Sequence, residues 1–334
     1  MLLDAMLPPT SLSSLPELAA SAEAVGFRGL WSTETQHDPF LPLALAAEHT
    51  QRIHLGTAIA VAFVRSPTVL AHTAWDLADA SRGRFILGLG TQVKAHVERR
   101  FGMEWPDSPA GKLRDLIQAM RAVWRSWQEG EALHHLGPYH KLTLMTPFFN
   151  PGPIEHPSIP VYIAGVNPAL CRLAGEVADG FIAHPYHSAE YLRQVVRPEI
   201  DAGAERAGRA PADIQLSVTA LAATDEAEVD FVRSQIAFYA STPSYRPVMA
   251  HHGWGEVADQ LRARSRQMAW GEMPSLITDE MLSTFAVVAP EANLAEQLLK
   301  RYARLADRLS LYLPYAPGSR DDFWRHLVAE MGAA

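Results

Sequence analysis

The sequence predicts an α/β protein in which eight parallel strands, alternating with helices, close into a (β/α)8 TIM barrel. Eight short apolar segments are separated by stretches with helical periodicity. Residues 53–61 and 85–89 are apolar at consecutive positions, as expected of strands covered on both faces of a parallel sheet. Eight parallel strands suffice to close a barrel. The predicted strands begin at Leu2, Gly29, Ile53, Phe85, Val161, Gly180, Ile214 and Leu309.

The clearest strand–helix–strand unit covers residues 53–91. After its first strand, Ser66 can cap a helix that has Pro67 at its first position. The second strand leads directly into Gly90 and Thr91. Because a right-handed crossover places both strand ends on the same rim, we expect ligands to gather at this rim.

The other elements continue this alternation along the chain. Helices are predicted over residues 13–25, 39–50, 111–128, 168–177, 188–207, 225–240, 290–305 and 321–331. Residues 131–158 and 241–285 contain several prolines and glycines and show neither period clearly, so they are expected to be insertions after strands four and seven, the second of them partly helical. Together these elements predict a single domain over residues 1–334.

An open, doubly wound sheet is the competing fold. Its dinucleotide motif GxGxxG is incomplete here, because Gly88 and Gly90 match the first two glycines whereas Val93 occupies the third position. This incomplete motif favours the closed barrel. A phosphate-binding P-loop, a zinc-binding HExxH pair and a GxSxG nucleophile elbow are also absent from the sequence, which argues against a phosphate-dependent kinase, a zinc protease and an esterase.

Composition narrows the class of function. The 334 residues are 48% hydrophobic and 20% charged, and a net charge of −8 argues against binding to nucleic acid or to an anionic membrane. The first residues lack a basic flank, and no later segment has about 18 uninterrupted apolar residues, so we expect a cytoplasmic protein. The single cysteine, Cys171, excludes an internal disulfide and a cysteine-rich metal site.

Several segments carry a family resemblance. The segments LGTAIAVAFVRSP, SRGRFILGLGTQVKAHVERRFG and VYIAGVNPALCRLAGEVADGFIAHP resemble the bacterial luciferase-like flavin and deazaflavin enzymes, and most of all their mycobacterial-type, F420-dependent branch. The similarity covers essentially the whole chain and includes ETQHDPFLPLALAAEHT and LSLYLPY. It implies a TIM barrel that binds a tricyclic redox ring, either coenzyme F420 or FMN.

The resemblance also implies where the cofactor binds. It places a non-prolyl cis peptide between Ala58 and Ile59, in a bulge of the third strand beneath the ring; an ordinary buried strand is the alternative. It places Gly90 and Thr91 beside the side chain of the cofactor.

Gly165, Val166 and Asn167 precede the helix that begins near residue 168. The resemblance assigns them to the cofactor phosphate, since free N–H groups and a helix dipole attract anions. A plain strand-to-helix turn explains the same residues.

The second predicted strand ends near Glu34, where members of the family carry an acid or an acid followed by histidine. Here Glu34 aligns with the acid, but Thr35 occupies the next position, where the family has histidine. The histidine of this chain, His37, comes two positions later. Our hypothesis is that Glu34 contacts the polar edge of the ring and that His37 acts as the catalytic acid or base. Alternatively, His37 and Asp38 cap the next helix.

His184 and His187 follow the sixth strand on the same predicted rim. We expect them to contact the substrate. Two histidines without a nearby carboxylate make a poor metal site, so no metal is predicted.

These assignments predict an F420-dependent oxidoreductase that transfers a hydride between the deazaflavin and a small organic substrate. One alternative is a monooxygenase that uses reduced FMN supplied by a separate reductase. Another is a barrel that binds flavin without turnover. The long amphipathic helices are compatible with a homodimer.

Overall fold

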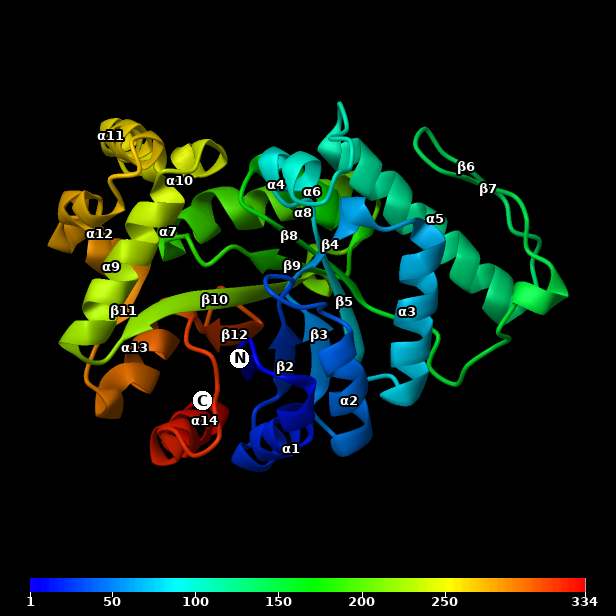
Figure 1. Cartoon of the computed structure of the whole chain (residues 1–334), viewed down its shortest axis with the longest axis horizontal. Helices are drawn as coiled ribbons and strands as arrows, with labels where there is room; N and C mark the ends of the chain where they lie inside the picture. The colour runs from blue at the N-terminus through cyan, green and yellow to red at the C-terminus, as the bar shows by residue number, and fades with distance from the viewer. Residues whose placement is uncertain (334) are drawn as a thin grey trace.

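The computed structural model describes residues 1–333, in which a closed parallel barrel is surrounded by helices (Figure 1). The eight strands of the barrel run in the order β12-β1-β2-β3-β5-β8-β9-β10, and β10 pairs with both β9 and β12. Their bounds are β1 Leu2–Met6, β2 Gly29–Ser32, β3 His54–Thr57, β5 Phe85–Gly90, β8 Val161–Gly165, β9 Gly180–Ala183, β10 Gln215–Ala223 and β12 Arg308–Leu311. The predicted (β/α)8 barrel is therefore confirmed. Residue 334, the end of the predicted domain, lies outside the described residues.

Every predicted strand is present, and no start differs by more than one residue. Two further pieces of this sheet were not predicted. The short strand β4, Ala60–Val61, continues the path of β3 and pairs with β5. The strand β11, Ala286–Val288, extends the sheet outside the barrel by pairing with the last residues of β10.

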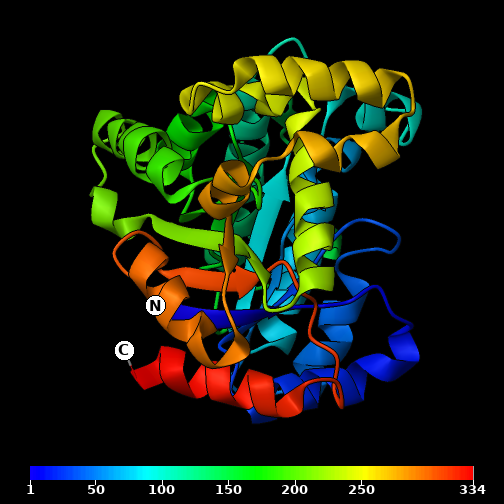
Figure 2. The same ribbon diagram turned by 90° about the vertical axis from the view of Figure 1, so that its left-hand side faces the viewer.

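The predicted helices are also present. They are α1 Leu15–Val25, α2 Leu41–His49, α3 Pro67–Ala80, α5 Pro109–Glu129, α6 Pro168–Val177, α9 Glu226–Ala240, α13 Glu291–Tyr302 and α14 Asp321–Ala333. The predicted cap of α3 is confirmed, because the Ser66 hydroxyl accepts a hydrogen bond from the Val69 N–H at 3.2 Å. Figure 2 shows α14 lying beside α1, so the two ends of the chain meet on one side of the barrel.

The helix predicted over residues 188–207 is interrupted. A first turn, α7 (Ala189–Tyr191), is followed by a π-helical turn over Leu192–Val196 and then by α8 (Arg197–Arg206). Pro198, early in α8, has no N–H and its ring displaces the carbonyl one turn earlier. This accounts for the wider turn that precedes it.

The first insertion, residues 131–158, contains a short antiparallel hairpin, β6 (His135–Leu136) and β7 (Lys141–Leu142). The second, residues 241–285, is more helical than expected. It forms α10 (Arg246–His251), α11 (Gly255–Arg266) and α12 (Asp279–Phe285). A short helix after β5, α4 (Lys94–Arg99), was not predicted.

The interior of the barrel is closed at its N-terminal end by a buried ion pair. Arg308 donates to both carboxylate oxygens of Asp4, at 2.8 and 2.9 Å, and the Trp31 indole N–H donates to the same carboxylate at 2.8 Å. Above this pair, the side chains of Trp31, Ile86, Tyr162 and Ile182 fill the barrel. Ligands can therefore approach only from the opposite end.

Among residues 1–333, no helix has the length and apolar character needed to span a bilayer.

Candidate active site

The candidate site lies at the C-terminal ends of the strands, where the barrel is open. Met6, Ala58, Ile59 and Ala164 pack on the inner side-chain cluster and are only partly buried. They form a small, apolar floor at the mouth of the barrel. Such a floor suits a flat, apolar ring better than a charged ligand.

The path of β3 is broken at this floor. The peptide bond between Ala58 and Ile59 is cis, as the resemblance implied. The end of β2 holds this segment by its backbone: the Ala58 N–H donates to the Ser32 carbonyl at 2.8 Å, and the Ile59 carbonyl accepts from the Glu34 N–H at 3.3 Å. Glu34, Ala58 and Ile59, predicted as one site, therefore lie together.

The carboxylate of Glu34 is committed to partners within the protein. It accepts from the Val61 N–H at 2.6 Å and from both terminal nitrogens of Arg65, at 2.7 and 2.8 Å. The Glu34 side chain is only 7% exposed. Arg65 also lies 3.4 Å from Asp38. Glu34 thus holds the β4 segment in place, and whether it also contacts a ring stays a prediction.

Arg65 is the residue that our sequence reasoning missed. It lies 31 residues from Glu34 in the chain. No local pattern links residues so far apart on two different strand ends.

Gly90 lies beside this segment, since β4 pairs Val61 with Gly90. A Cβ atom at Gly90 would lie 2.8 Å from the side chain of Ile59. The glycine therefore makes room for Ile59. Thr91 follows at the rim and is half-buried.

The turn between β8 and α6 offers hydrogen-bond donors. Asn167 caps α6, because its side-chain oxygen accepts from the Leu170 N–H at 3.0 Å. Within residues 1–333, the N–H groups of Val166 and Asn167 donate no hydrogen bond to the protein. Gly165, just before them, pairs with Ala183 of β9. Two uncommitted donors at a helix N-terminus can hold an anion.

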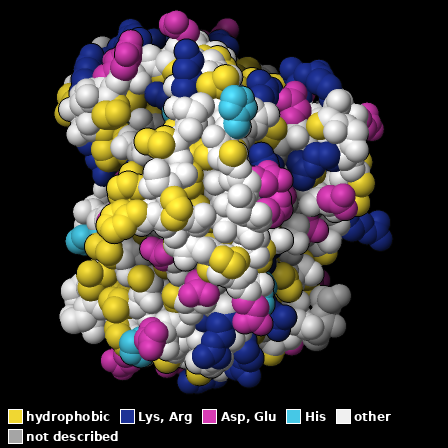
Figure 3. Space-filling view, turned by 90° about the vertical axis from the view of Figure 1, so that its right-hand side faces the viewer, with side chains coloured by type: hydrophobic (Ala, Val, Ile, Leu, Met, Phe, Trp, Pro, Cys, Tyr) yellow, Lys and Arg dark blue, Asp and Glu magenta, His cyan; other side chains and the backbone are white. Residues whose placement is uncertain are grey.

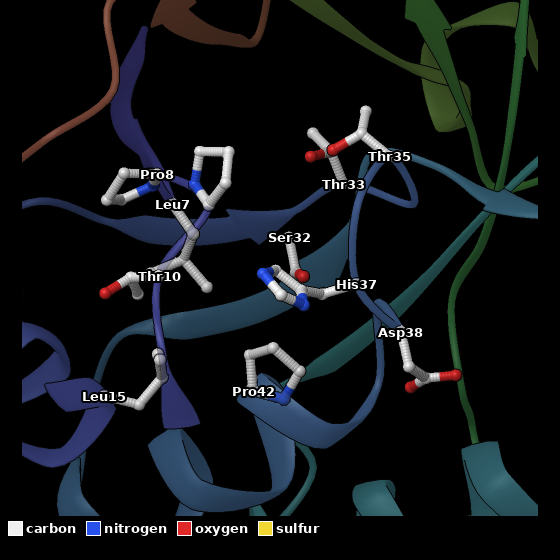
Figure 4. A pocket seen from close by; sticks show the side chains of 11 residues that line it. Leu7, Pro8, Thr10, Leu15, Ser32, Thr33, Thr35, His37, Asp38 and Pro42 are labelled. Carbon is white, nitrogen blue, oxygen red and sulfur yellow. The ribbon is translucent and has the colours of Figure 1, made fainter. Parts of the chain in front are cut away.

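His37 lies in a separate recess at the rim between the ends of β1 and β2. Figure 4 shows its imidazole turned into this recess, towards Ser32, whereas Asp38 points away. Asp38 caps α2: its Oδ1 accepts from the Phe40 and Leu41 N–H groups at 2.8 and 3.1 Å. The capping alternative therefore holds for Asp38, whereas the His37 side chain makes no hydrogen bond within residues 1–333.

The structure separates the two histidines that follow β9. His187 is buried, and its ring nitrogens lie 2.8 Å from the His184 carbonyl and 3.2 Å from the Tyr302 hydroxyl of α13. Burial lowers the pKa of His187 to about 4. With both nitrogens engaged and 3% of its surface exposed, His187 has no nitrogen free for a substrate.

His184 remains at the rim. Its backbone N–H lies 3.4 Å from the Gly165 carbonyl, and its ring packs against Tyr239 and Tyr245. Burial lowers the pKa of His184 to about 3, so the ring is neutral at pH 7. Its Nδ1 accepts from the Tyr186 N–H at 3.1 Å, which places the ring proton on Nε2.

The described residues contain no group of three His, Cys, Asp or Glu side chains that could hold a metal ion. The site thus consists of an apolar floor, backbone donors, one neutral histidine and the Glu34–Arg65 pair.

Comparison with known proteins assigns the chain to a family. The family described as luciferase-like monooxygenase matches residues 3–308, which is most of the chain. The chain belongs to this family. The predicted luciferase-like oxidoreductase is thereby confirmed at the level of the family.

Two relatives illustrate the range of this family. An uncharacterised protein of Mycobacterium tuberculosis is 44% identical over 307 residues, which cover 90% of each chain. An F420-dependent glucose-6-phosphate dehydrogenase of Amycolatopsis mediterranei is 30% identical over 217 residues, which cover 61% of this chain and 63% of the relative.

Solved structures share the fold at lower identity. The coenzyme F420-dependent tetrahydromethanopterin reductase of Methanopyrus kandleri has a TM-score of 0.76 and 23% identity, and 98% of this chain and 96% of that chain are covered. The oxygenating constituent of 3,6-diketocamphane monooxygenase from Pseudomonas putida, solved with FMN, has a TM-score of 0.68 and 16% identity, covering 100% and 99%.

Proposed function

We propose that this protein is an F420-dependent oxidoreductase that transfers a hydride between the deazaflavin ring and a small organic substrate. The observation that carries the proposal is the combination, at one end of the barrel, of an uncovered apolar floor with the uncommitted N–H groups of Val166 and Asn167. A flat ring joined to a phosphate needs both features. The F420-dependent relative supports F420 as that ligand.

The residues present fit such a cofactor. Ala58 and Ile59 would lie beneath the ring, and Gly90 and Thr91 would lie beside the chain that links ring and phosphate. The turn formed by Gly165, Val166 and Asn167 would hold the phosphate. When bound, the cofactor supplies the carbon that accepts or gives the hydride.

Glu34, Arg65 and His184 keep the mouth of the barrel ordered and add little net charge to it. Glu34 and Arg65 fix the β4 backbone through hydrogen bonds that are already formed, so no reorganisation is needed when a ligand arrives. His184 stays uncharged at pH 7, and its Nε2–H would donate to a substrate oxygen. The apolar floor offers water no hydrogen-bond partner beneath the reacting atoms.

Titration of the purified protein with F420 and with FMN tests the proposal. We expect F420 fluorescence to change saturably with one site per chain, and FMN to bind at least tenfold more weakly. Tight FMN binding without F420 binding would reverse this order. Absence of binding by either cofactor would remove the proposed function altogether.

The second candidate is an FMN-dependent monooxygenase that receives reduced flavin from a separate reductase. The description of the family and the FMN-bound structural relative favour it. It predicts oxygen uptake with chemically reduced FMN and a substrate, whereas an F420 enzyme needs no oxygen.

His37 provides a prediction about proton transfer. The residue is exposed, and its ring turns into the recess beside the mouth. We expect His37→Ala to lower turnover by about 100-fold, the usual contribution of a general acid or base, and to leave cofactor affinity unchanged. Undiminished turnover in this variant would remove His37 from the mechanism.

A further inference from the structure

The inner face of the barrel continues past the strand ends on one side of the mouth. Ile182 and Arg308 point into the barrel. Because side chains alternate along a strand, His184 shares the inward face of Ile182, two positions earlier. For the same reason Tyr312 shares the inward face of Arg308, four positions earlier. The Tyr312 N–H still donates to the Ala220 carbonyl at 2.8 Å, which keeps the alternation in register beyond β12.

Helix α9 stands on this side of the mouth, and Figure 2 shows it beside the end of β12. The hydroxyl oxygens of Tyr239 and Tyr312 are 2.7 Å apart, and the Tyr312 hydroxyl donates to Oε1 of Gln235 at 3.3 Å. Because Tyr312 gives its only proton to Gln235, the proton between the two hydroxyls belongs to Tyr239. Burial and the neighbouring Tyr312 raise the pKa of Tyr239, so this proton is retained at pH 7.

The Tyr239 oxygen accepts no hydrogen bond within residues 1–333, so it can accept one from a ligand. His184 offers the complementary group. Its ring stands edge-on to the ring of Tyr239, with the two centroids 4.6 Å apart, and its proton lies on Nε2. An acceptor and a donor therefore lie next to each other at the mouth. A hydroxyl group can satisfy both, because it donates as well as accepts, whereas a carbonyl oxygen can only accept.

Aromatic rings adjoin these polar groups. The ring of Phe231 lies nearly parallel to that of Tyr312, with the centroids 6.3 Å and the planes 24° apart, and Phe231 is 49% exposed. Phe231, Gln235 and Phe238 are spaced four and three residues apart, so they form one stripe along α9. A solvent-facing stripe of a helix usually carries charged residues. This stripe instead presents ring faces on which an aromatic ligand can pack.

A second group of exposed aromatic side chains lies in the insertion between α5 and β8. Phe148 and Phe149 are 88% and 65% exposed, and their ring centroids are 5.1 Å apart. Figure 3 views the side of the molecule that carries the β6–β7 hairpin of this insertion and shows hydrophobic side chains gathered in a strip. These two residues belong to a loop and not to a strand end, so they provide a control for the rings at the mouth.

We propose that the side of the mouth formed by β9, β12 and α9 is a binding subsite for a small aromatic alcohol. The hydroxyl of the ligand accepts from Nε2–H of His184 and donates to the oxygen of Tyr239, while its ring packs on Phe231. Tyr312 and Gln235 are positioning residues, because they orient the proton of Tyr239. Only the statement that this alcohol is the substrate rests on the proposed function.

Binding of three small probes to the purified full chain without cofactor tests the proposal. The probes are benzyl alcohol, toluene, which lacks the hydroxyl, and cyclohexylmethanol, which lacks the aromatic ring. Dissociation constants are measured by titration with ligand-observed NMR. We expect benzyl alcohol to bind about tenfold more tightly than toluene and about fivefold more tightly than cyclohexylmethanol.

Three variants locate the subsite. Tyr239→Phe should weaken the binding of benzyl alcohol by about tenfold and leave that of toluene unchanged, whereas a general loss of structure would weaken both. Phe231→Leu should remove the preference for benzyl alcohol over cyclohexylmethanol. The matched control, Phe149→Leu, should leave both preferences unchanged.

Tyr312→Phe tests the positioning role. It frees the proton of Tyr239, so the preference should shift from benzyl alcohol towards benzaldehyde, whose oxygen can only accept. Equal affinity of the wild type for benzyl alcohol and toluene, or absence of binding by all three probes, would overturn the subsite. Wild-type preferences in both Tyr239→Phe and Phe231→Leu would do the same. A failure of F420 to bind would contradict the proposed function and leave these measurements unaffected, because they need no cofactor.

Discussion

Replacing Glu34 with Gln is expected to weaken binding of the proposed F420 cofactor at least tenfold and to lower the free energy of unfolding by about 2 kcal/mol, the value of hydrogen bonds to a charged group. The variant removes the charge that holds both terminal nitrogens of Arg65 and that accepts from the Val61 N–H. The β4 segment would then have to be ordered by the cofactor, and each 1.4 kcal/mol spent on ordering raises the dissociation constant tenfold. Fluorescence titration and urea unfolding measure the two effects.

A double-mutant cycle measures how far the effect of Glu34 on cofactor affinity depends on Arg65. If Glu34 acts through Arg65, the effects of Glu34→Gln and Arg65→Met on cofactor affinity should not add in the double variant. Asp38→Ala is the control, because Asp38 touches Arg65 only at 3.4 Å but caps α2. It should cost about 1 kcal/mol of stability and leave affinity unchanged. If the wild type binds F420 and Glu34→Gln binds it with the same affinity, the proposed role of Glu34 in ordering the β4 segment is wrong. The proposed cofactor is not contradicted by that result.

Replacing Arg308 with Met is expected to destabilise the protein by about 3–5 kcal/mol, because it leaves a buried charge without its partner. Asp4 and Arg308 have side chains that are 1% and 3% exposed, and the remaining polar neighbour of Asp4 would be the Trp31 indole. Urea unfolding at pH 7 measures the loss. The open end of the barrel is not touched by this substitution.

The stability lost in Arg308→Met should become smaller as the pH falls. Burial raises the pKa of Asp4 above its ordinary value, although Arg308 opposes this shift. Without Arg308 the folded state favours the neutral carboxyl more strongly, so the stability of Arg308→Met should increase as the pH falls from 7 towards 5.

The double variant Asp4→Leu/Arg308→Met removes both charges and should recover most of the lost stability. If Arg308→Met is as stable as the wild type at pH 7, the Asp4–Arg308 ion pair contributes little to the free energy of unfolding.

The barrel could be predicted from the sequence because its causes are local. Consecutive apolar residues mark strands buried on both faces, and Ser66 and Asn167 each stand three residues before the N–H that they cap. The alternation of these elements leaves few topologies. The order of the strand ends then brings Glu34, Ala58, Gly90 and Gly165 to one rim.

The barrel, its rim and the residues that reach the rim follow from the order of residues in the chain. The directions in which their side chains point depend on the packed fold. Arg65 pairs with Glu34 across 31 positions, Arg308 pairs with Asp4 across 304, and His187 turns towards Tyr302 while His184 stays at the mouth. Backbone conformation follows from neighbours in the chain, whereas the partner of a buried polar group is set by whichever distant group packing brings within hydrogen-bond distance.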